Sequence, residues 1–257
     1  MENTCHCPEL VAEHGLSLLI ETSGARILFD AGASPAFASN AGHMGVNLAS
    51  VNLAVLSHGH YDHGGGLSRF LELNSHASVL VSPHAFDGHF NAIGRDIGLN
   101  AALASHPRVV RVSETVCSPL PGLTLYAGSV LGDSAEDIAG GMTMVVDGVR
   151  QPEDFRHEQY MVIEEAGRRI LFSGCSHRGV LRIVRHFRPD VFVGGFHLMK
   201  LNPQLDADAL LATADELAAY PTIYLTGHCT GEGAFRVMQR RMGRRLRSLS
   251  TGQVIDL

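Results

Sequence analysis

The chain has 257 residues, of which 45% are hydrophobic and 18% are charged, a composition typical of a globular rather than a disordered protein. The formal net charge is −6 with histidine neutral, so no overall positive charge points to nucleic acid or a membrane surface as a partner. No apolar stretch reaches the length of a membrane span, and residues 1–9 lack the basic start and apolar core of a secretory signal. Because the five cysteines also lack the spacing of a disulfide framework, we expect a cytoplasmic protein.

The first third of the chain alternates between strand and helix patterns. Short apolar runs predict strands over residues 16–20 and 26–29, joined by a turn at 22–24, and further strands over 51–56 and 77–81. Helices are expected within residues 35–45 and over 68–73. This alternation is typical of a layered α/β domain.

Residues 83–109 are rich in glycine, histidine and asparagine. A stretch of this kind in a compact domain is either a lid over a site or a plain surface excursion, and we favour a lid. His84 and His89 lie within it, and we do not expect either to be a metal ligand.

The rest of the chain returns to the α/β pattern. Strands are expected over residues 109–112, 123–126, 142–146, 160–164, 169–172, 190–193 and 222–225, and helices over 179–187 and 206–220. The arginine-rich residues 236–247 predict a solvated helix face, with a phosphate-binding or oligomer surface as the alternative; the sequence leaves the oligomeric state open. No linker separates two halves, so we expect a single domain over 1–257.

The densest cluster of chemically active side chains lies in residues 57–66, Ser-His-Gly-His-Tyr-Asp-His-Gly-Gly-Gly. His58 and His60 are two residues apart, so in an extended segment they point the same way. Asp62 and His63 follow where the chain turns into a helix. The two pairs have a spacing suited to two metal ions about 3.5–4 Å apart. The three glycines allow a sharp turn close to the ions.

The same kind of ending recurs along the chain. Four apolar strands end in glycine or serine beside histidine, aspartate or cysteine, at residues 57–58, 173–177, 194–197 and 226–229. In layered α/β proteins, sites gather where strands end and loops begin. We therefore expect side chains from these distant segments to meet at one edge of the sheets.

The motif His58-x-His60-x-Asp62-His63 with three following glycines resembles the signature of the metallo-β-lactamase fold superfamily. Residues 12–20, 27–32, 173–177, 194–198 and 226–231 are similar to one branch of it, named for a 7,8-dihydropterin-6-yl-methyl-4-(β-D-ribofuranosyl)aminobenzene 5'-phosphate synthase. The resemblance covers about residues 12–231. It implies an αββα sandwich, in which two mixed β-sheets pack together with helices on the outer faces.

The resemblance also implies a set of metal ligands. These are His58, His60, Asp62, His63 and His228, with His177 or Cys175 completing the set. Many superfamily members carry a bridging aspartate where this chain has Cys175, so either the thiolate binds or His177 takes over. A thiolate favours zinc, whereas nitrogen and oxygen ligands alone also suit manganese or iron. One or two divalent ions are expected.

Further residues are expected around the ligands. Asp30 closes a strand and can fix the orientation of a metal-bound imidazole, although a turn or helix cap is the alternative. His197 is expected to donate a proton to a leaving group. His14 with Glu13 is expected to hold substrate or the lid, and His157 lies where the superfamily often has a ligand.

These residues predict a metal-dependent hydrolase or transferase acting on a phosphate-bearing or otherwise anionic small molecule. Asp62 would both ligate the metal and orient its water. A synthase of the branch's named kind would instead use the metal to assist departure of pyrophosphate from a dihydropterin. The alternative is a metal-stabilised ligand-binding or regulatory protein without turnover. The open, glycine-rich loops favour an enzyme over a closed structural cage.

Overall fold

The first of three sheets is built from the N-terminal third of the chain. The computed structural model describes residues 1–132 and 140–257. This sheet has the order β1-β2-β3-β4-β6, with β1 at Leu18–Glu21, β2 at Arg26–Phe29, β3 at Leu53–Val55, β4 at Ser78–Val81 and β6 at Val109–Arg111. Only the β1–β2 pair is antiparallel, so the sheet is mixed.

The second sheet is larger and is also mixed. Its order is β15-β14-β13-β12-β11-β8-β7, with β7 at Val116–Leu120, β8 at Leu123–Ala127, β11 at Gln159–Glu165, β12 at Arg168–Phe172, β13 at Val191–Val193, β14 at Ile223–Thr226 and β15 at Leu246–Ser248. The strands from β12 to β15 run parallel, and β7, β8 and β11 are antiparallel to their neighbours. The parallel strands therefore present their carboxyl ends at one edge.

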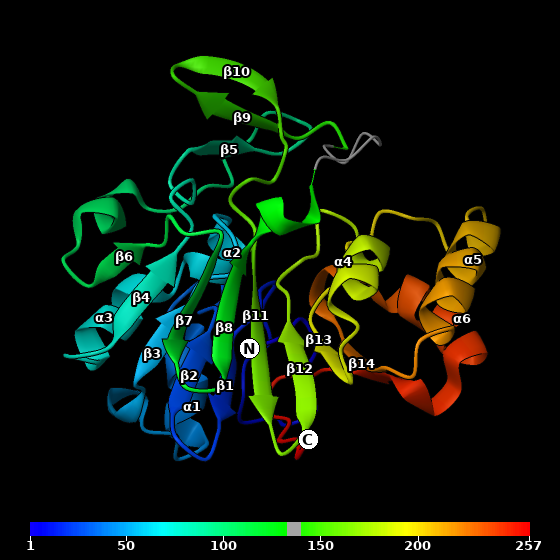
Figure 1. The fold of residues 1–257 in the computed structure, drawn as a ribbon, viewed down its shortest axis with the longest axis horizontal. Helices are drawn as coiled ribbons and strands as arrows, with labels where there is room; N and C mark the ends of the chain where they lie inside the picture. The colour runs from blue at the N-terminus through cyan, green and yellow to red at the C-terminus, as the bar shows by residue number, and fades with distance from the viewer. Residues whose placement is uncertain (133–139) are drawn as a thin grey trace.

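Helices cover the outer faces of the two sheets. They are α1 at Ala36–His43, α2 at Tyr61–Gly64, α3 at Leu67–Leu73, α4 at Val180–Phe187, α5 at Ala207–Ala218 and α6 at Glu232–Met242. Figure 1 shows α4, α5 and α6 together beside the second sheet, with α1 and α3 on the side of the first. The 3-10 turns are η1 at Leu48–Ser50, η2 at Ala101–Ser105, η3 at Gly128–Leu131, η4 at His228–Thr230 and η5 at Gly243–Arg245. Within the two described ranges, no helix combines the length and apolar character needed to cross a bilayer.

Three apolar layers hold the sandwich together. In β2, Ile27 and Phe29 face the layer between the two sheets, whereas Leu28 faces the layer under α1 and α3. In β13, Val191 likewise faces the inter-sheet layer and Phe192 packs under α4, α5 and α6. Both faces of these strands are buried, which explains why they form continuous apolar runs rather than alternating ones.

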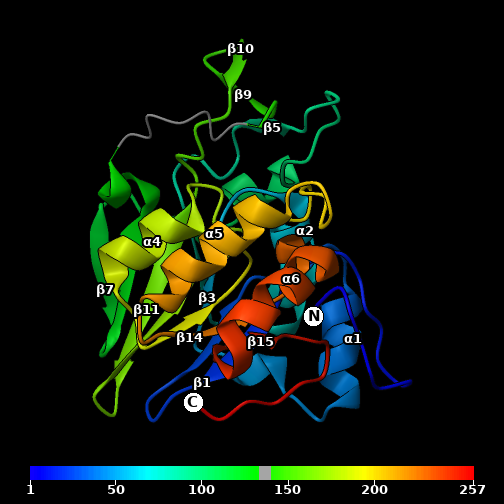
Figure 2. The ribbon, with the colours of Figure 1, turned by 90° about the vertical axis from the view of Figure 1, so that its right-hand side faces the viewer.

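A third, small sheet stands at one end of the molecule. It has the order β10-β9-β5, with β5 at Gly88–Phe90, β9 at Thr143–Val146 and β10 at Val149–Pro152. Both views place it at the end of the sandwich where α2 lies (Figures 1 and 2). We call it the flap sheet. It combines β5 from the glycine- and histidine-rich stretch with β9 and β10 from about 55 residues later.

The predicted αββα fold class is confirmed, and most predicted strands and helices are present. The strand expected over 142–146 exists, but it belongs to the flap sheet. The sequence analysis missed β5, β7, β10 and β15. Three of these have only three or four residues, and β7 contains Pro119, which lowers its strand propensity.

Gly194 provides a test of how tightly the strand ends pack. Its φ is +148°, and a Cβ atom there would lie 1.8 Å from the carbonyl oxygen of Ser173. We expect Gly194→Ala to lower the free energy of unfolding by about 2–4 kcal/mol through backbone strain and overpacking. Urea unfolding followed by circular dichroism measures this loss. Gly42→Ala in α1 is the matched control, because a Cβ there meets nothing within 4 Å; it should change stability by less than about 1 kcal/mol, in the stabilising direction.

Candidate metal centre

The predicted side chains meet where the strands of both main sheets end. The residues brought together are His58 and His60 after β3, Asp62 and His63 in α2, Cys175 and His177 after β12, His197 after β13, and His228 after β14. Their backbones turn sharply at these positions. Ser176, His197 and His228 adopt positive φ angles of 57°, 54° and 46°. Non-glycine residues in this region carry local strain, which tends to collect at functional sites.

One half of the cluster lies around His63. Its Nε2 atom is 3.1 Å from Nε2 of His228 and 3.2 Å from Sγ of Cys175. The Oδ2 atom of Asp62 is 3.2 Å from Nε2 of His228 and 3.8 Å from Nε2 of His63. Ligands of a tetrahedral ion with bonds of about 2.0–2.1 Å lie roughly 3.3–3.4 Å apart. These four side chains therefore have the spacing of a metal site.

Hydrogen bonds on the far side of each ring set which nitrogen faces inward. Nδ1 of His63 donates to Oδ2 of Asp30 at 2.6 Å, and Nδ1 of His228 donates to Oδ1 of Asn3 at 3.0 Å. A neutral imidazole has one N–H group, so both Nε2 atoms then carry lone pairs. Two lone pairs that face each other at 3.1 Å require a cation between them, either a proton or a metal ion.

The other half of the cluster lies around His58. Oγ of Ser57 donates to Asp30 at 2.7 Å, so it accepts from Nδ1 of His58 at 2.9 Å. This leaves the Nε2 lone pair of His58 facing Nδ1 of His60, 3.0 Å away. His177 also has a potential ligand atom within 4.8 Å of both.

Unsatisfied nitrogen atoms show that this half also fits a metal ion. Neither ring nitrogen of His177 has a hydrogen-bond partner, although the residue is only 6% exposed. Nδ1 of His197, beside His177, is likewise buried without a partner. A buried polar atom without a hydrogen bond costs about 1–3 kcal/mol, so a row of them is explained when a ligand completes the site.

Burial keeps most of these imidazoles neutral. It lowers the pKa of His60 to about 3, and together with neighbouring histidines it lowers the pKa values of His58 and His177 well below the usual 6.5. Burial alone would raise the pKa of Asp62, but the neighbouring side chains of His63 and His228 outweigh burial and lower that pKa. At neutral pH the site therefore offers lone pairs and a carboxylate.

His63 is the exception. Burial alone would lower its pKa, but the carboxylates of Asp30 and Asp62 outweigh burial and raise the pKa to about 9. A cation that binds at Nε2 of His63 must displace a proton at neutral pH. Burial also raises the pKa of the Cys175 thiol, so a thiolate ligand there releases a second proton.

The structure gives each remaining predicted residue a definite place. Cys175 and His177 are not alternatives in space: Cys175 contacts His63, and His177 joins His58 and His60. His197 lies beside His177, with ring centroids 4.2 Å apart. Nε2 of His14 lies 3.4 Å from Asp62 at the exposed rim.

Glu13 and His157, which the sequence analysis placed around the ligands, make hydrogen bonds that it did not predict. The carboxylate of Glu13 accepts hydrogen bonds from the backbone of Ala33 and Ser34 and from the Ser34 hydroxyl, so it holds the loop after β2. His157 is fully buried, and its Nδ1 accepts a hydrogen bond from the Gly59 N–H at 2.8 Å. It therefore lies behind residues 57–60, the loop after β3 that we call the metal loop.

Several supporting residues were missed by the sequence analysis. They are Asn3, Ser57 and Glu158. Glu158 is fully buried, and its carboxylate accepts from the backbone N–H of His177 at 2.8 Å and from the hydroxyl of Tyr160 at 2.6 Å. Ser57 directly precedes the motif, and Glu158 lies in the polar segment before β11, so position gave a signal for both. Nothing in the sequence pointed to Asn3.

The raised pKa of His63 predicts how metal affinity depends on pH. Binding displaces the His63 proton below pH 9, so affinity should rise at least about tenfold per unit between pH 7 and 8.5 and less steeply above pH 9, where only the Cys175 thiol still has a proton to lose. Chelator competition with zinc at several pH values measures this slope. Asp30→Asn should weaken binding about 10- to 100-fold at pH 9 and flatten the slope, because His63 loses its carboxylate partner.

Asp215→Asn is the control for that experiment, since Asp215 pairs with Arg241 on the exposed surface of α5 and α6. It should bind zinc as the unchanged protein does. A wild-type affinity independent of pH between 7 and 8.5 would contradict the assignment of His63 as a ligand.

Comparison with known proteins agrees with this geometry. The family model described as the metallo-beta-lactamase superfamily matches residues 10–228. An uncharacterized protein from Methanocaldococcus jannaschii is 26% identical over 90% of this chain and 89% of its own length. From the same organism, 7,8-dihydropterin-6-methyl-4-(beta-D-ribofuranosyl)-aminobenzene-5'-phosphate synthase is 25% identical over 95% of this chain and 90% of its own.

Solved structures show the same fold. Tm1679, described as a metal-dependent hydrolase of the beta-lactamase superfamily, aligns with a TM-score of 0.85 and 25% identity, covering 100% of this chain and 96% of its own. Zn(2+)-bound PqqB from Methylobacterium extorquens aligns with a TM-score of 0.56 and 13% identity over 97% of this chain and 90% of its own. The ligand-bearing strand ends, the sandwich and these matches agree: the chain belongs to the metallo-β-lactamase superfamily.

Proposed function

We propose that this protein is a metal-dependent enzyme that acts on a phosphate-bearing or similarly anionic small molecule, with hydrolysis as its reaction. The observation that carries the proposal is the buried set of ring nitrogens that face one another at 3.0–3.1 Å, where a proton or a metal ion can lie between them, beside the Asp62 carboxylate. The side chain of Asp62 is 12% exposed, whereas the His63 side chain is fully buried. The centre is therefore enclosed by protein at His63 and reaches solvent at Asp62, which suits a catalytic rather than a structural site.

The residues divide into two groups that could hold one or two divalent ions. Asp62, His63, Cys175 and His228 form one group, and His58, His60 and His177 form the other. The thiol of Cys175 favours zinc in the first group, and the all-nitrogen second group accepts zinc, manganese or iron. A bound divalent ion lowers the pKa of coordinated water towards about 7 and polarises a phosphoryl oxygen.

The protein's own side chains supply orientation and proton transfer. Nδ1 of His14 accepts from the Asn3 amide, so its Nε2–H faces Asp62 at 3.4 Å and fixes that carboxylate at the rim. Asp62 can then orient an attacking water molecule. His197 is half-buried beside His177, with an unpartnered Nδ1, and we assign it the transfer of a proton to the leaving group.

Transfer of a dihydropterin group is the second candidate. It is supported by the full-length similarity to a protein named as a synthase that makes a dihydropterin–ribofuranosylaminobenzene phosphate. The same centre would then assist loss of pyrophosphate while an aromatic carbon attacks. Both reactions need an anionic group beside the ions, and they differ in whether water or the aromatic ring is the nucleophile.

The assignment of the metal ligands predicts complete dependence of turnover on Asp62 and His60. Asp62→Ala and His60→Ala should each lower kcat/KM for a generic phosphodiester by at least about 10³-fold, or roughly 4 kcal/mol. His43→Ala, on the exposed face of α1, is the matched control and should keep full activity. Metal analysis of protein purified without added metal accompanies the assay. Metal present with no turnover on any phosphate ester or dihydropterin substrate would instead support a ligand-binding protein.

The role of His197 predicts a dependence on the leaving group. His197→Gln should keep its metal content and lower kcat by about 10²-fold for an alkyl phosphate ester, whose leaving group needs a proton. The effect should be several-fold at most for a p-nitrophenyl ester, whose leaving group departs without one. An equal loss on both esters would contradict proton transfer by His197.

A further inference from the structure

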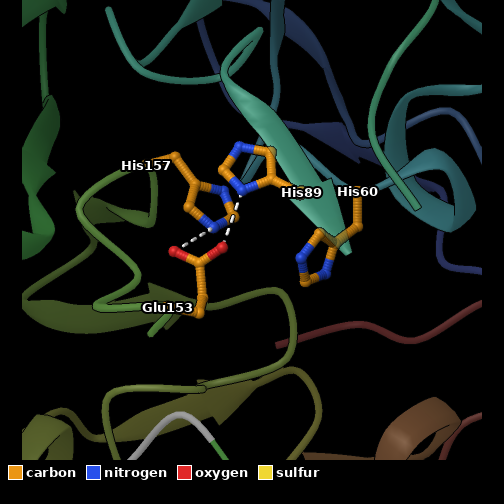
Figure 3. A group of neighbouring side chains, drawn as sticks. All are labelled: His60, His89, Glu153 and His157. Atoms are coloured by element: carbon orange, nitrogen blue, oxygen red, sulfur yellow. Dashed lines mark hydrogen bonds and ion pairs between the residues drawn. The ribbon is translucent and has the colours of Figure 1, made fainter. Parts of the chain in front are cut away.

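A second group of buried side chains lies behind the candidate metal centre. Figure 3 shows His89 and His157 beside the Glu153 carboxylate and the ring of His60 next to this group, and one potential ligand atom of each of the four residues lies within 4.8 Å of the others. His89 lies on β5 of the flap sheet and Glu153 directly follows β10. The composition resembles a third metal site, but the hydrogen bonds around each ring point to a different role.

His157 presents a donor, not a lone pair, to this group. Its Nδ1 accepts from the backbone N–H of Gly59 at 2.8 Å, so in the neutral ring the hydrogen is on Nε2. That Nε2 lies 3.6 Å from Oε1 of Glu153 and has no hydrogen-bond partner. A protonated Nε2 cannot bind a metal ion, whereas it can donate to a carboxylate after a shift of a few tenths of an ångström.

The other two rings can also present N–H groups. Nδ1 of His89 donates to Oε2 of Glu153 at 2.7 Å. Nδ1 of His60 faces His58 across the metal centre, so a metal ion bound at this atom leaves the hydrogen on Nε2. This Nε2 is buried and unpartnered. The Glu153 carboxylate thus accepts from His89 and from the backbone N–H of Phe155 at 3.0 Å and has the N–H of His157 nearby, so its negative charge is satisfied without a further cation.

We propose that Glu153 is a positioning residue for the metal centre, which turns Nδ1 of His60 towards the metal and ties the flap sheet to the metal loop. The inference rests on the proposed metal-dependent function. A carboxylate that accepts from the outer N–H of a metal-bound histidine fixes the ring and raises its basicity as a ligand. Asp30 has this relation to His63 at 2.6 Å, and Glu153, with a carboxylate oxygen within 4.8 Å of a ring nitrogen of His60, would take the same role for the unpartnered Nε2 of His60.

Backbone contacts around Glu153 also connect the flap sheet to the metal loop. Beyond His157, the backbone N–H of Gln159 donates to the Ser57 carbonyl at 2.8 Å, so residues 153–159 lie along the metal loop. On the other side of the loop, a Cβ at Gly59 would lie 2.3 Å from the carbonyl oxygen of Ala85, just ahead of β5. The loop is therefore held between two segments that Glu153 joins through His89 and His157.

Glu153→Gln tests the proposal with little change in shape. The amide NH2 group meets imidazole N–H groups, donor against donor, so His60 can no longer gain a carboxylate partner. In the full-length protein, the zinc Kd from chelator competition should rise about 10- to 100-fold, while saturating zinc should still fill the same number of sites. The visible spectrum of the cobalt-substituted variant should shift, because the geometry at His60 changes. Glu72→Gln, an exposed carboxylate on α3, is the matched control and should match the wild type in both.

Hydrogen exchange tests the tie to the flap sheet without metal. Amides of β9 and β10 should exchange faster in Glu153→Gln and in His89→Gln than in Glu72→Gln. His89→Gln leaves Glu153 and His157 in place, so it keeps the proposal testable if Glu153→Gln does not fold; its zinc Kd should rise several-fold.

Three results would overturn the proposal in different ways. Unchanged zinc Kd, cobalt spectrum and exchange in both variants would leave Glu153 with no positioning role. Loss of one whole ion per chain in Glu153→Gln, with the others bound as tightly as before, would show a third cation site. A wild-type protein that binds no divalent ion would remove the proposed function itself. This failure is distinguished from the first two because in those the wild-type protein still binds zinc.

Discussion

The structure depends on one electrostatic constraint: the ring nitrogens of buried histidines are turned towards each other. Asp30 accepts from His63, and through Ser57 it also sets the orientation of His58, while Asn3 fixes His228. These contacts leave ring nitrogens 3.0–3.1 Å apart, so that a proton or a metal ion lies between the two nitrogens of each pair. A divalent cation can take the place of these protons, so the surrounding protein offers a candidate site for one.

The sandwich supplies the rigidity that this constraint needs. The central parallel strands β3, β4, β13 and β14 are buried on both faces, and the turns after β3, β12, β13 and β14 bring the candidate ligands to one edge. The sharp turns at these ends place side chains from segments far apart in the sequence within contact distance. The flap sheet closes the end of the molecule near α2, and the Glu153 cluster connects it to the metal loop. Fold stability and ligand geometry are therefore coupled through the same strand ends.

Much of the fold and of the candidate site was predictable from the sequence, and the parts that were not have physical causes. The apolar runs indicated a layered α/β domain, because strand periodicity is local, and the family resemblance supplied the sandwich and the candidate ligands His58, His60, Asp62, His63 and His228, which the structure brings together. The choice between Cys175 and His177 could not be resolved, since it depends on the turn at Ser176, whose φ is 57°. Asn3 contacts His228 across 225 residues, and His89 reaches Glu153 through a sheet of very short strands. Such contacts leave no periodic pattern in the chain.

Anomalous X-ray diffraction at the zinc absorption edge, on crystals of protein purified without added metal and then given zinc, tests the central claim most directly. The account predicts an anomalous peak enclosed by Nε2 of His63, Nε2 of His228, Asp62 and Sγ of Cys175, with the sulfur at roughly 2.3 Å from the ion. A second peak is allowed only among His58, His60 and His177. Absence of any peak in this cluster, or a peak only beside Glu153, would contradict it.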